Sequence, residues 1–368
     1  MLRAANETGT AMRRLLPCLL LIASTSVAAV SAETARPPVS PPPVAAGAAV
    51  DEGRSPAQGR DGADIVDLDT MVVSGVQPGP GLWKVTARNG HVLWVLGTLS
   101  PLPRGMEWDS RRVGEAIAAS QEVLLSPSVS VDTDAGFFGN LTLIPIALKA
   151  RRNPDGKRLQ DVVPAAQYAR WQVLKARYIG GDRGIEQWRP VFAALELYGK
   201  AIEKSGMSGR GVVGPQVARL AKRQGLPTTN PVVKITIAEP RKALKEFSTT
   251  ALDDGDCFAR TLDRIETDLG TMRARANAWA IGDVQTLREL PFGNQFTACS
   301  AAFSSAALAR KYGVADMAGQ MEAKWLAAAE GALARNASTF ATLPIAELLK
   351  PGGYLSRLEA KGYEVEAP

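Results

Sequence analysis

The sequence predicts an α/β protein in which a central mixed β-sheet is flanked by helices and carries a large, mostly helical insert. Three observations predict this class. Apolar strand patterns occur near both ends of the chain, at residues 82–99 and 339–343. An Asn-Gly turn joins the first two strands as a hairpin. Helical periodicity dominates the residues in between. Strands at both ends with helices between them are typical of a domain built on one sheet.

The first hairpin joins strands predicted at residues 82–86 and 92–96 around the turn Asn89-Gly90. Both turn residues tolerate positive φ, which makes this pair a strong hairpin signal. His91, the single histidine of the chain, follows the tip and is expected to be solvated. The second strand is apolar at nearly every position, so we expect it to be buried on both faces.

Asp109 is the predicted cap of a helix over residues 109–120, and residues 122–125 form a short buried strand that ends at Ser126. The helical insert follows at residues 135–225. A glycine-rich stretch at 206–211 follows no strand, which favours a connection between helices over a phosphate-binding loop.

The last third of the chain alternates strands with helices. Residues 256–281 carry an apolar stripe at spacings of four and three, which predicts one long helix with a coiled-coil-like seam. Gly282 ends this helix and Asp283 caps the next one. The other predicted elements are strands at 232–237, 339–343 and 363–365, and helices at 315–335 and 352–361.

The composition is that of a globular protein: 46% of the 368 residues are apolar and 22% are charged. The net charge is +6, and no dense basic run occurs beyond short groups such as Arg151-Arg152. Because proteins that bind nucleic acids usually carry a clustered basic footprint, we expect no nucleic-acid partner.

The N-terminus predicts export. Arg13 and Arg14 precede an apolar stretch at residues 15–30, which small residues follow, so we expect a signal peptide over residues 1–32 that starts at Met12. At about sixteen residues this stretch is short for a membrane span, which favours cleavage over an uncleaved anchor. We expect a periplasmic or secreted protein with no stable membrane span after cleavage.

Residues 33–80 form a predicted disordered linker, because runs of proline with Ala, Gly and Asp cannot build a core. The folded domain is expected at residues 81–368. Export leaves Cys257 and Cys299, and an even number of cysteines in an oxidising compartment permits a disulfide. Two separately buried thiols are the alternative.

Three predicted strands end in segments that could carry chemistry, because sites in open α/β sheets lie beyond the carboxyl ends of strands. The segments are residues 97–100, 125–126 and 344–347. The order and spacing of the motifs around them resemble the TraB/GumN family, which is related to the TIKI metalloproteases and, more distantly, to erythromycin-esterase-like proteins.

The resemblance covers residues 81–367. The family opens with a Leu-Trp strand and a second strand that ends in Gly-Thr-x-His, matched here by residues 82–83 and 97–100. An Ala-Trp-x-x-Gly-Asp-x-x-x-Leu motif is matched closely by residues 278–287. The family closes with a Gly-x-x-His-Leu step, matched here by residues 344–348, and an Arg-x-x-Gly-Tyr-x-Val tail, whose end is matched by residues 361–365.

The resemblance implies two histidines and a glutamate as metal ligands or catalytic groups, which suit a divalent metal that activates water. This chain has Ser100, Ser126 and Glu347 at these positions, and Pro344 replaces the glycine before the second histidine. A serine hydroxyl is a poor ligand and a poor base, and one carboxylate cannot hold a transition metal firmly. These departures predict loss of the hydrolytic activity and no bound cofactor.

His91 cannot replace either histidine, because nine residues of strand separate it from Ser100, or about 30 Å. Ser100 could act as a nucleophile if Glu347 served as its base, but Ser100 and Ser126 can equally be residues that end strands before prolines. Thr98 is a candidate for the lining of the remaining cleft. Trp108 could line the cleft or pack in the core or at its rim.

Three hypotheses of function follow from the resemblance. The first is an exported pseudoenzyme that binds a peptide, a glycan or an envelope protein in the former active-site cleft. Gly97, the glycine of the Gly-Thr-x-His motif, is the family residue that remains in this cleft. The second is a hydrolase with a rearranged site around Glu347, Ser100 and Ser126. The third is a structural or inhibitory envelope protein that acts through the insert at residues 135–225.

Overall fold

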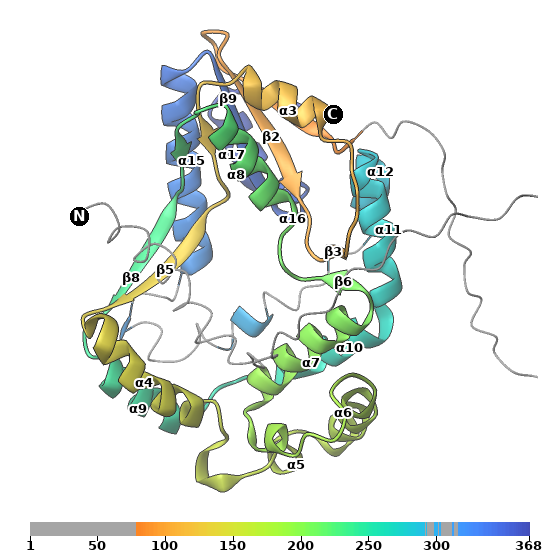
Figure 1. Ribbon diagram of the computed structural model, residues 1–368, viewed down its shortest axis with the longest axis vertical. Coiled ribbons are helices and arrows are strands. Elements are labelled where there is room, and N and C mark those ends of the chain that lie inside the picture. The colour runs from red at the N-terminus through yellow and green to blue at the C-terminus, as the bar shows by residue number, and fades with distance from the viewer. Residues whose placement is uncertain (1–78, 291, 293–297, 301, 303–310, 313–315) are drawn as a thin grey trace, which may run out of the picture. The chain divides into compact units, whose positions relative to one another are not determined.

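The computed structural model describes residues 79–290, 292, 298–300, 302, 311–312 and 316–368, so the predicted signal peptide and nearly all of the predicted linker lie outside the described residues (Figure 1). The fold is α/β, as predicted, and its main sheet has the strand order β10-β1-β2-β9-β4-β7. Strand β1 is antiparallel to β2 and β10, whereas β2, β9, β4 and β7 are parallel. The strands span Leu82–Thr86 (β1), Val92–Thr98 (β2), Val123–Leu124 (β4), Thr228–Thr229 (β7), Ser338–Pro344 (β9) and Glu364–Glu366 (β10).

The predicted hairpin is confirmed, with Lys84 of β1 opposite Trp94 of β2. Gly90 has a φ of 80°, which its missing side chain permits. The expectation of a solvated His91 is wrong, because its Nδ1 lies 2.7 Å from the carbonyl oxygen of Leu333 in a partly buried position. The cause is tertiary: the end of helix α15 (Met317–Arg335) lies beside the start of β2.

The sheet core centres on β2 and β9. Leu93, Val95 and Leu96 of β2 are completely buried, as are Phe340 and Leu343 of β9. This confirms the expectation that the strand after the hairpin is covered on both faces. The helices that contribute to the same apolar cluster are α3 (Arg111–Ala118), α8 (Val213–Arg223), α11 (Leu269–Ala280), α12 (Val284–Glu289), α15, α16 (Ile345–Leu348) and α17 (Tyr354–Ala360).

Helix α3 begins at Arg111 rather than at the predicted Asp109, and Ser110 is its N-cap residue. Asp109 still acts at this end, since its Oδ1 accepts a hydrogen bond from the backbone N–H of Arg111 at 2.9 Å. The helices predicted near 315–335 and 352–361 and the strand near 363–365 are present as α15, α17 and β10.

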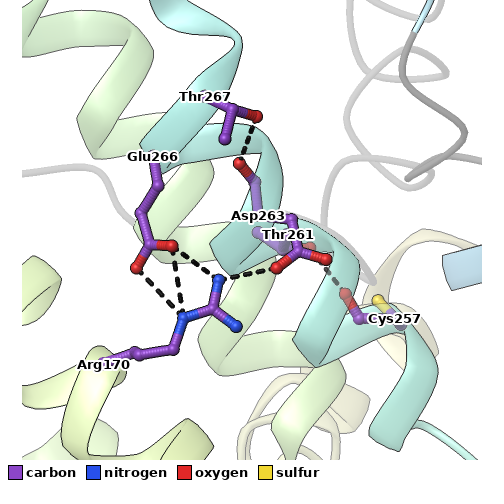
Figure 2. Close-up of polar contacts among 6 residues, drawn as sticks. All are labelled: Arg170, Cys257, Thr261, Asp263, Glu266 and Thr267. Carbon is purple, nitrogen blue, oxygen red and sulfur yellow. Dashed lines mark hydrogen bonds and ion pairs between the residues drawn. The ribbon is translucent and has the colours of Figure 1, made fainter.

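Residues 135–225 hold most of the helices outside the sheet core. They are α4 (Gly136–Ala150), α5 (Leu159–Val162), α6 (Ala165–Tyr178) and α7 (Pro190–Lys204), with two 3-10 turns, η1 (Pro154–Gly156) and η2 (Gly184–Gln187). The last helix of the range, α8, packs in the sheet core. A second apolar cluster joins α5, α6 and α7 to α10 (Gly255–Thr267) through residues such as Trp171 and Phe258. At the surface, Arg170 of α6 bonds Asp263 and Glu266 of α10, both at 2.6 Å (Figure 2).

The predicted helix over residues 256–281 is wrong as one element, because the chain breaks it at Asp268 into α10 and α11. The Asp268 carboxylate accepts a hydrogen bond from Arg275 at 2.7 Å and lies 3.3 Å from Nε of Arg264. We call the apolar cluster around β2 and β9 the sheet cluster, and the second cluster, around α5, α6, α7 and α10, the insert cluster. The predicted stripe is shared between them, because Phe258 lies in the insert cluster and Trp279 in the sheet cluster.

The predicted end of this helical region is confirmed. Gly282 has a φ of 71°, and a Cβ there would lie 2.9 Å from the carbonyl oxygen of Gly79. Asp283 then caps α12 by accepting a hydrogen bond from the backbone N–H of Thr286 at 2.9 Å.

The predicted central mixed sheet is present, and two small sheets that the sequence did not predict accompany it. Strand β5 (Ser128–Thr133), which the sequence analysis missed, is parallel to β8 (Val232–Ile237). These strands lead into α4 and α9 (Pro240–Thr249), which lie side by side (Figure 1). The second small sheet pairs β3 (Leu102–Pro103) with β6 (Met207–Ser208), so the glycine-rich connection contains a short strand.

Cys257 and Cys299 form a disulfide, which decides between the two alternatives left by the sequence. The bridge ties α10 to a residue 42 positions further along the chain. No helix in the described ranges combines the length and the apolar character that crossing a bilayer requires.

Candidate functional site

The candidate site lies at the carboxyl edge of the parallel strands β2, β9 and β4. Thr98 of β2 is opposite Pro344 of β9, and Leu124 of β4 is opposite Ala341 of β9. Ser100 and Ser126 each follow a strand by two residues, and Glu347 lies in α16, directly after β9. Because the three strands are neighbours and parallel, the three positions singled out by the sequence follow the same edge of the sheet.

Ser100 is exposed, and its Oγ donates a hydrogen bond to the carbonyl oxygen of Gly209 at 3.1 Å. Gly209 follows β6 in the glycine-rich connection. The same connection is held at a second point, where the backbone N–H of Arg104 donates to the carbonyl of Gly206 at 2.9 Å. The turn after β2 is therefore bonded to a segment more than one hundred residues away, and the Ser100 hydroxyl takes part in that bonding.

Ser126 is bonded to the neighbouring strand. Its backbone N–H donates to Oγ1 of Thr342 at 2.9 Å, and its Oγ lies 3.1 Å from the same atom. Thr342 is buried in β9. Thr98 bonds β9 in a similar way, since its Oγ1 donates to the carbonyl of Leu343 at 3.2 Å. These hydroxyls connect one strand to the next at the sheet edge, as residues that end strands do.

Glu347 is partly exposed and forms an ion pair with Lys350 one turn later, at 3.7 Å. Burial raises the pKa of nearby Tyr354 to about 12, and the negative charges of Glu347 and Glu322 add to this effect. No hydrogen bond or ion pair joins the side chains of Ser100, Ser126 and Glu347, although the structure describes all three. A nucleophile and base pair of Ser100 and Glu347 would need such a contact.

Gly97 and Trp279 form the best-defined contact of the site. The indole Nε1 of Trp279 donates a hydrogen bond to the carbonyl oxygen of Gly97 at 2.6 Å. A Cβ at Gly97 would lie 2.3 Å from Cδ1 of Ile345, so a larger residue there would force the Ile345 side chain of α16 to shift. Gly97 was predicted as a motif residue, but its partner Trp279 was not predicted as part of the site. The signal for Trp279 was its place in the second motif.

Trp108 packs against Trp279 edge to face, with ring centroids 5.3 Å apart. It is partly buried and contacts the sheet cluster, so it packs beside the candidate site. Its Nε1 is buried and has no hydrogen-bond partner among the residues that the structure describes.

A model of the TraB/PrgY/gumN family matches residues 81–367, which is most of the chain and all of the main sheet. The chain belongs to the TraB/PrgY/gumN family. Comparison with curated proteins and comparison with solved structures gave no match. Family membership agrees with the contact between Gly97 and Trp279, because these residues come from two separate motifs that the sequence analysis assigned to the family.

The resemblance implies a divalent metal, which the side chains at these three positions would have to hold. A protein site that holds such a metal firmly needs imidazole nitrogens, thiolate sulfurs or several carboxylates as ligands. Ser100 and Ser126 offer hydroxyls that are already bonded to protein oxygens, and Glu347 offers one carboxylate that is paired with Lys350. This donor set does not fit a firmly held divalent metal.

Proposed function

We propose that this chain is an exported member of the TraB/PrgY/gumN family that has lost the hydrolytic site and acts as a binding module in the cell envelope. Its partner would be a peptide, a glycan or an envelope protein. The proposal rests on one observation above all: the positions where the resemblance implies His, Glu and His hold Ser100, Ser126 and Glu347.

The contacts of these three side chains support the proposal. The hydroxyls of Ser100 and Ser126 bond backbone and threonine oxygens, so neither is paired with a base that would activate it for attack. Glu347 has Lys350 as its ion-pair partner, at 3.7 Å. These contacts stabilise the sheet edge rather than prepare a reaction.

The edge itself suits binding. The carboxyl ends of parallel strands are where α/β proteins bind ligands, whatever their chemistry. Ser100, Glu347 and Lys350 are exposed or partly exposed there and offer a hydroxyl, a carboxylate and an ammonium group. Such groups bond the backbone of a peptide or the hydroxyls of a sugar.

The experiment compares the full chain with two variants, by elemental analysis for zinc and manganese and by a screen of peptide and ester hydrolysis. The wild-type protein is expected to hold no stoichiometric metal and to show no hydrolysis. The variant Ser100→His/Ser126→Glu/Glu347→His restores the ligand set, and we expect it to bind zinc if the three positions converge.

The variant Glu347→Ala serves as the control. Wild-type hydrolysis that disappears in Glu347→Ala would overturn the proposal, because it would show a rearranged site that works. Stoichiometric metal in the wild-type protein that Glu347→Ala releases would overturn it as well.

A further inference from the structure

Helix α4 is unusually apolar for a helix that lies outside the core. Of its residues, Gly136–Ala150, Lys149 alone is charged. Its main packing partner is α9, and Leu143 of α4 and Ala243 of α9 are buried. No side chain of α4 or α9 belongs to the buried part of the three apolar clusters found among the described residues. We call α4 and α9 the helix pair.

One face of α4 presents apolar side chains to solvent. Leu141 is 48% exposed, Pro145 is exposed and Leu148 is partly exposed. Their spacing of four and three residues places them on one side of the helix. Exposed apolar stripes of this kind are uncommon on monomeric soluble proteins. They mark a surface that a membrane or another molecule covers.

The helix pair is also basic. Arg241, Lys242 and Lys245 of α9 are exposed, and Lys149 lies at the end of α4. Arg241 is fixed beside the apolar stripe, because its Nη2 donates to Oγ1 of Thr142 at 2.7 Å.

Two acidic groups near the helix pair bond lysines, and Asp132 and Asp134 before α4 are exposed. Glu246, the one acidic residue within α9, bonds Lys311 at 2.8 Å. Glu239, just before α9, bonds Lys242 at 3.0 Å. The net charge of the helix pair is therefore positive next to its apolar stripe.

We propose that the helix pair docks on an anionic phospholipid bilayer. The stripe of α4 would enter the boundary between headgroups and acyl chains, and the cations of α9 would lie against lipid phosphates. An apolar helix face with flanking lysines and arginines is the combination that binds such a surface, because area burial and charge attraction add. The inference does not depend on the state of the strand-end site.

The test is co-sedimentation of the full chain with vesicles of phosphatidylglycerol and phosphatidylcholine, and with vesicles of phosphatidylcholine alone. We expect binding to the anionic vesicles that weakens as salt rises. Leu141→Glu/Leu148→Glu is expected to lower the affinity about tenfold or more, since it places charges where apolar contact is needed.

The matched control is Val173→Glu, because Val173 is 69% exposed on α6, away from the helix pair. A second variant, Lys242→Gln/Lys245→Gln, leaves the apolar stripe intact and removes two charges. It is expected to lower binding to anionic vesicles about tenfold or more, since each basic residue near the surface contributes about 1 kcal/mol. Circular dichroism checks that each variant folds, and all four proteins share the same N-terminal residues.

Equal vesicle binding by all four proteins would overturn the proposal, and so would equal loss in Val173→Glu. A change of oligomeric state in Leu141→Glu/Leu148→Glu with unchanged vesicle binding would also overturn it, because the stripe would then contact a second copy. If the double glutamate variant does not fold, the comparison of Lys242→Gln/Lys245→Gln with Val173→Glu decides the question.

Discussion

At Gly97 the backbone of β2 lies so close to Ile345 of α16 that a side chain there would displace the tip of the isoleucine. A Cβ there would lie 2.3 Å from Cδ1 and 3.3 Å from Cβ of Ile345. The same residue accepts the hydrogen bond from Trp279. A glycine that a motif might assign to catalysis therefore has a packing role that is sufficient to explain it.

Gly97→Ala is expected to destabilise the protein by about 1–3 kcal/mol, the usual range for overpacking. The double variant Gly97→Ala/Ile345→Val should recover part of this loss, because valine lacks the Cδ1 atom that clashes. Chemical denaturation of both single variants and the double variant measures the coupling. Strict additivity would contradict the packing explanation.

Glu122, at the opposite end of β4 from the candidate site, is a buried carboxylate with three donors. Thr229 donates to it at 2.5 Å, Asn336 at 2.8 Å and Arg335 at 3.1 Å. Burial acts to raise the pKa of Glu122, but these hydrogen bonds together outweigh burial, so the pKa lies below its ordinary value. Its ionised form is therefore favoured by folding.

The sign of the pH effect follows from this shift. A carboxylate with a lowered pKa stabilises the folded state at pH values above its unfolded pKa, about 4.3, and this contribution is lost as pH falls through the folded pKa. Glu122→Gln should cost about 1–3 kcal/mol at pH 7 and less in acid. Denaturation at pH 7 and below pH 4 measures both values, with Glu115→Gln, an exposed residue of α3, as the control. A cost independent of pH would contradict the assignment.

Among the elements, the break between α10 and α11 shows how one buried carboxylate redirects a helix. The apolar spacing continues across Asp268, but Asp268 is bonded to Arg275, which is itself buried. α10 then packs in the insert cluster and α11 in the sheet cluster. The disulfide lies on α10, where Thr261 also bonds the carbonyl of Cys257 (Figure 2).

Removal of the disulfide by Cys257→Ser/Cys299→Ser is expected to lower the free energy of unfolding by about 2–4 kcal/mol, because the bridge closes a long loop in the unfolded chain. Denaturation with and without reductant measures it. The wild-type protein should lose a similar amount in reductant, whereas the variant should not respond. An effect of reductant on the variant would show that the bridge is not the cause.

At the scale of the whole described domain, two separate apolar clusters carry most of the buried residues. Leu93 of β2 lies in the sheet cluster and Leu262 of α10 in the insert cluster, and both are completely buried. Regions with separate cores can open separately. The short break at Asp268 joins α10 of one cluster to α11 of the other, and residues 205–212 join α7 to α8 in the same way.

Leu93→Ala and Leu262→Ala form a matched pair, each expected to cost about 2–5 kcal/mol. Leu262→Ala should reduce hydrogen-exchange protection mainly in α6, α7 and α10, and Leu93→Ala mainly in β2 and β9. Exchange followed by mass spectrometry measures both patterns. If each variant lowers protection throughout the domain, the clusters form one cooperative unit instead.

The candidate site could be placed from the sequence but not described. The strand ends were predicted because apolar runs and turn residues are local signals, and a parallel arrangement brings their carboxyl ends to one edge. The partners of Ser100 and Ser126 could not be predicted. Gly209 and Thr342 lie more than one hundred residues away from them in the chain.

The sequence by itself determined the hairpin at Asn89-Gly90, the buried strands and the helix end at Gly282. Each depends on residues within a few positions of one another, where backbone preference and side-chain spacing decide the result. The tertiary structure alone decided the break at Asp268, the pairing of β5 with β8 and the disulfide. The strand pairing and the disulfide depend on partners that are distant in the chain. The break at Asp268 divides the helical stripe between two apolar clusters, which the apolar spacing alone does not predict.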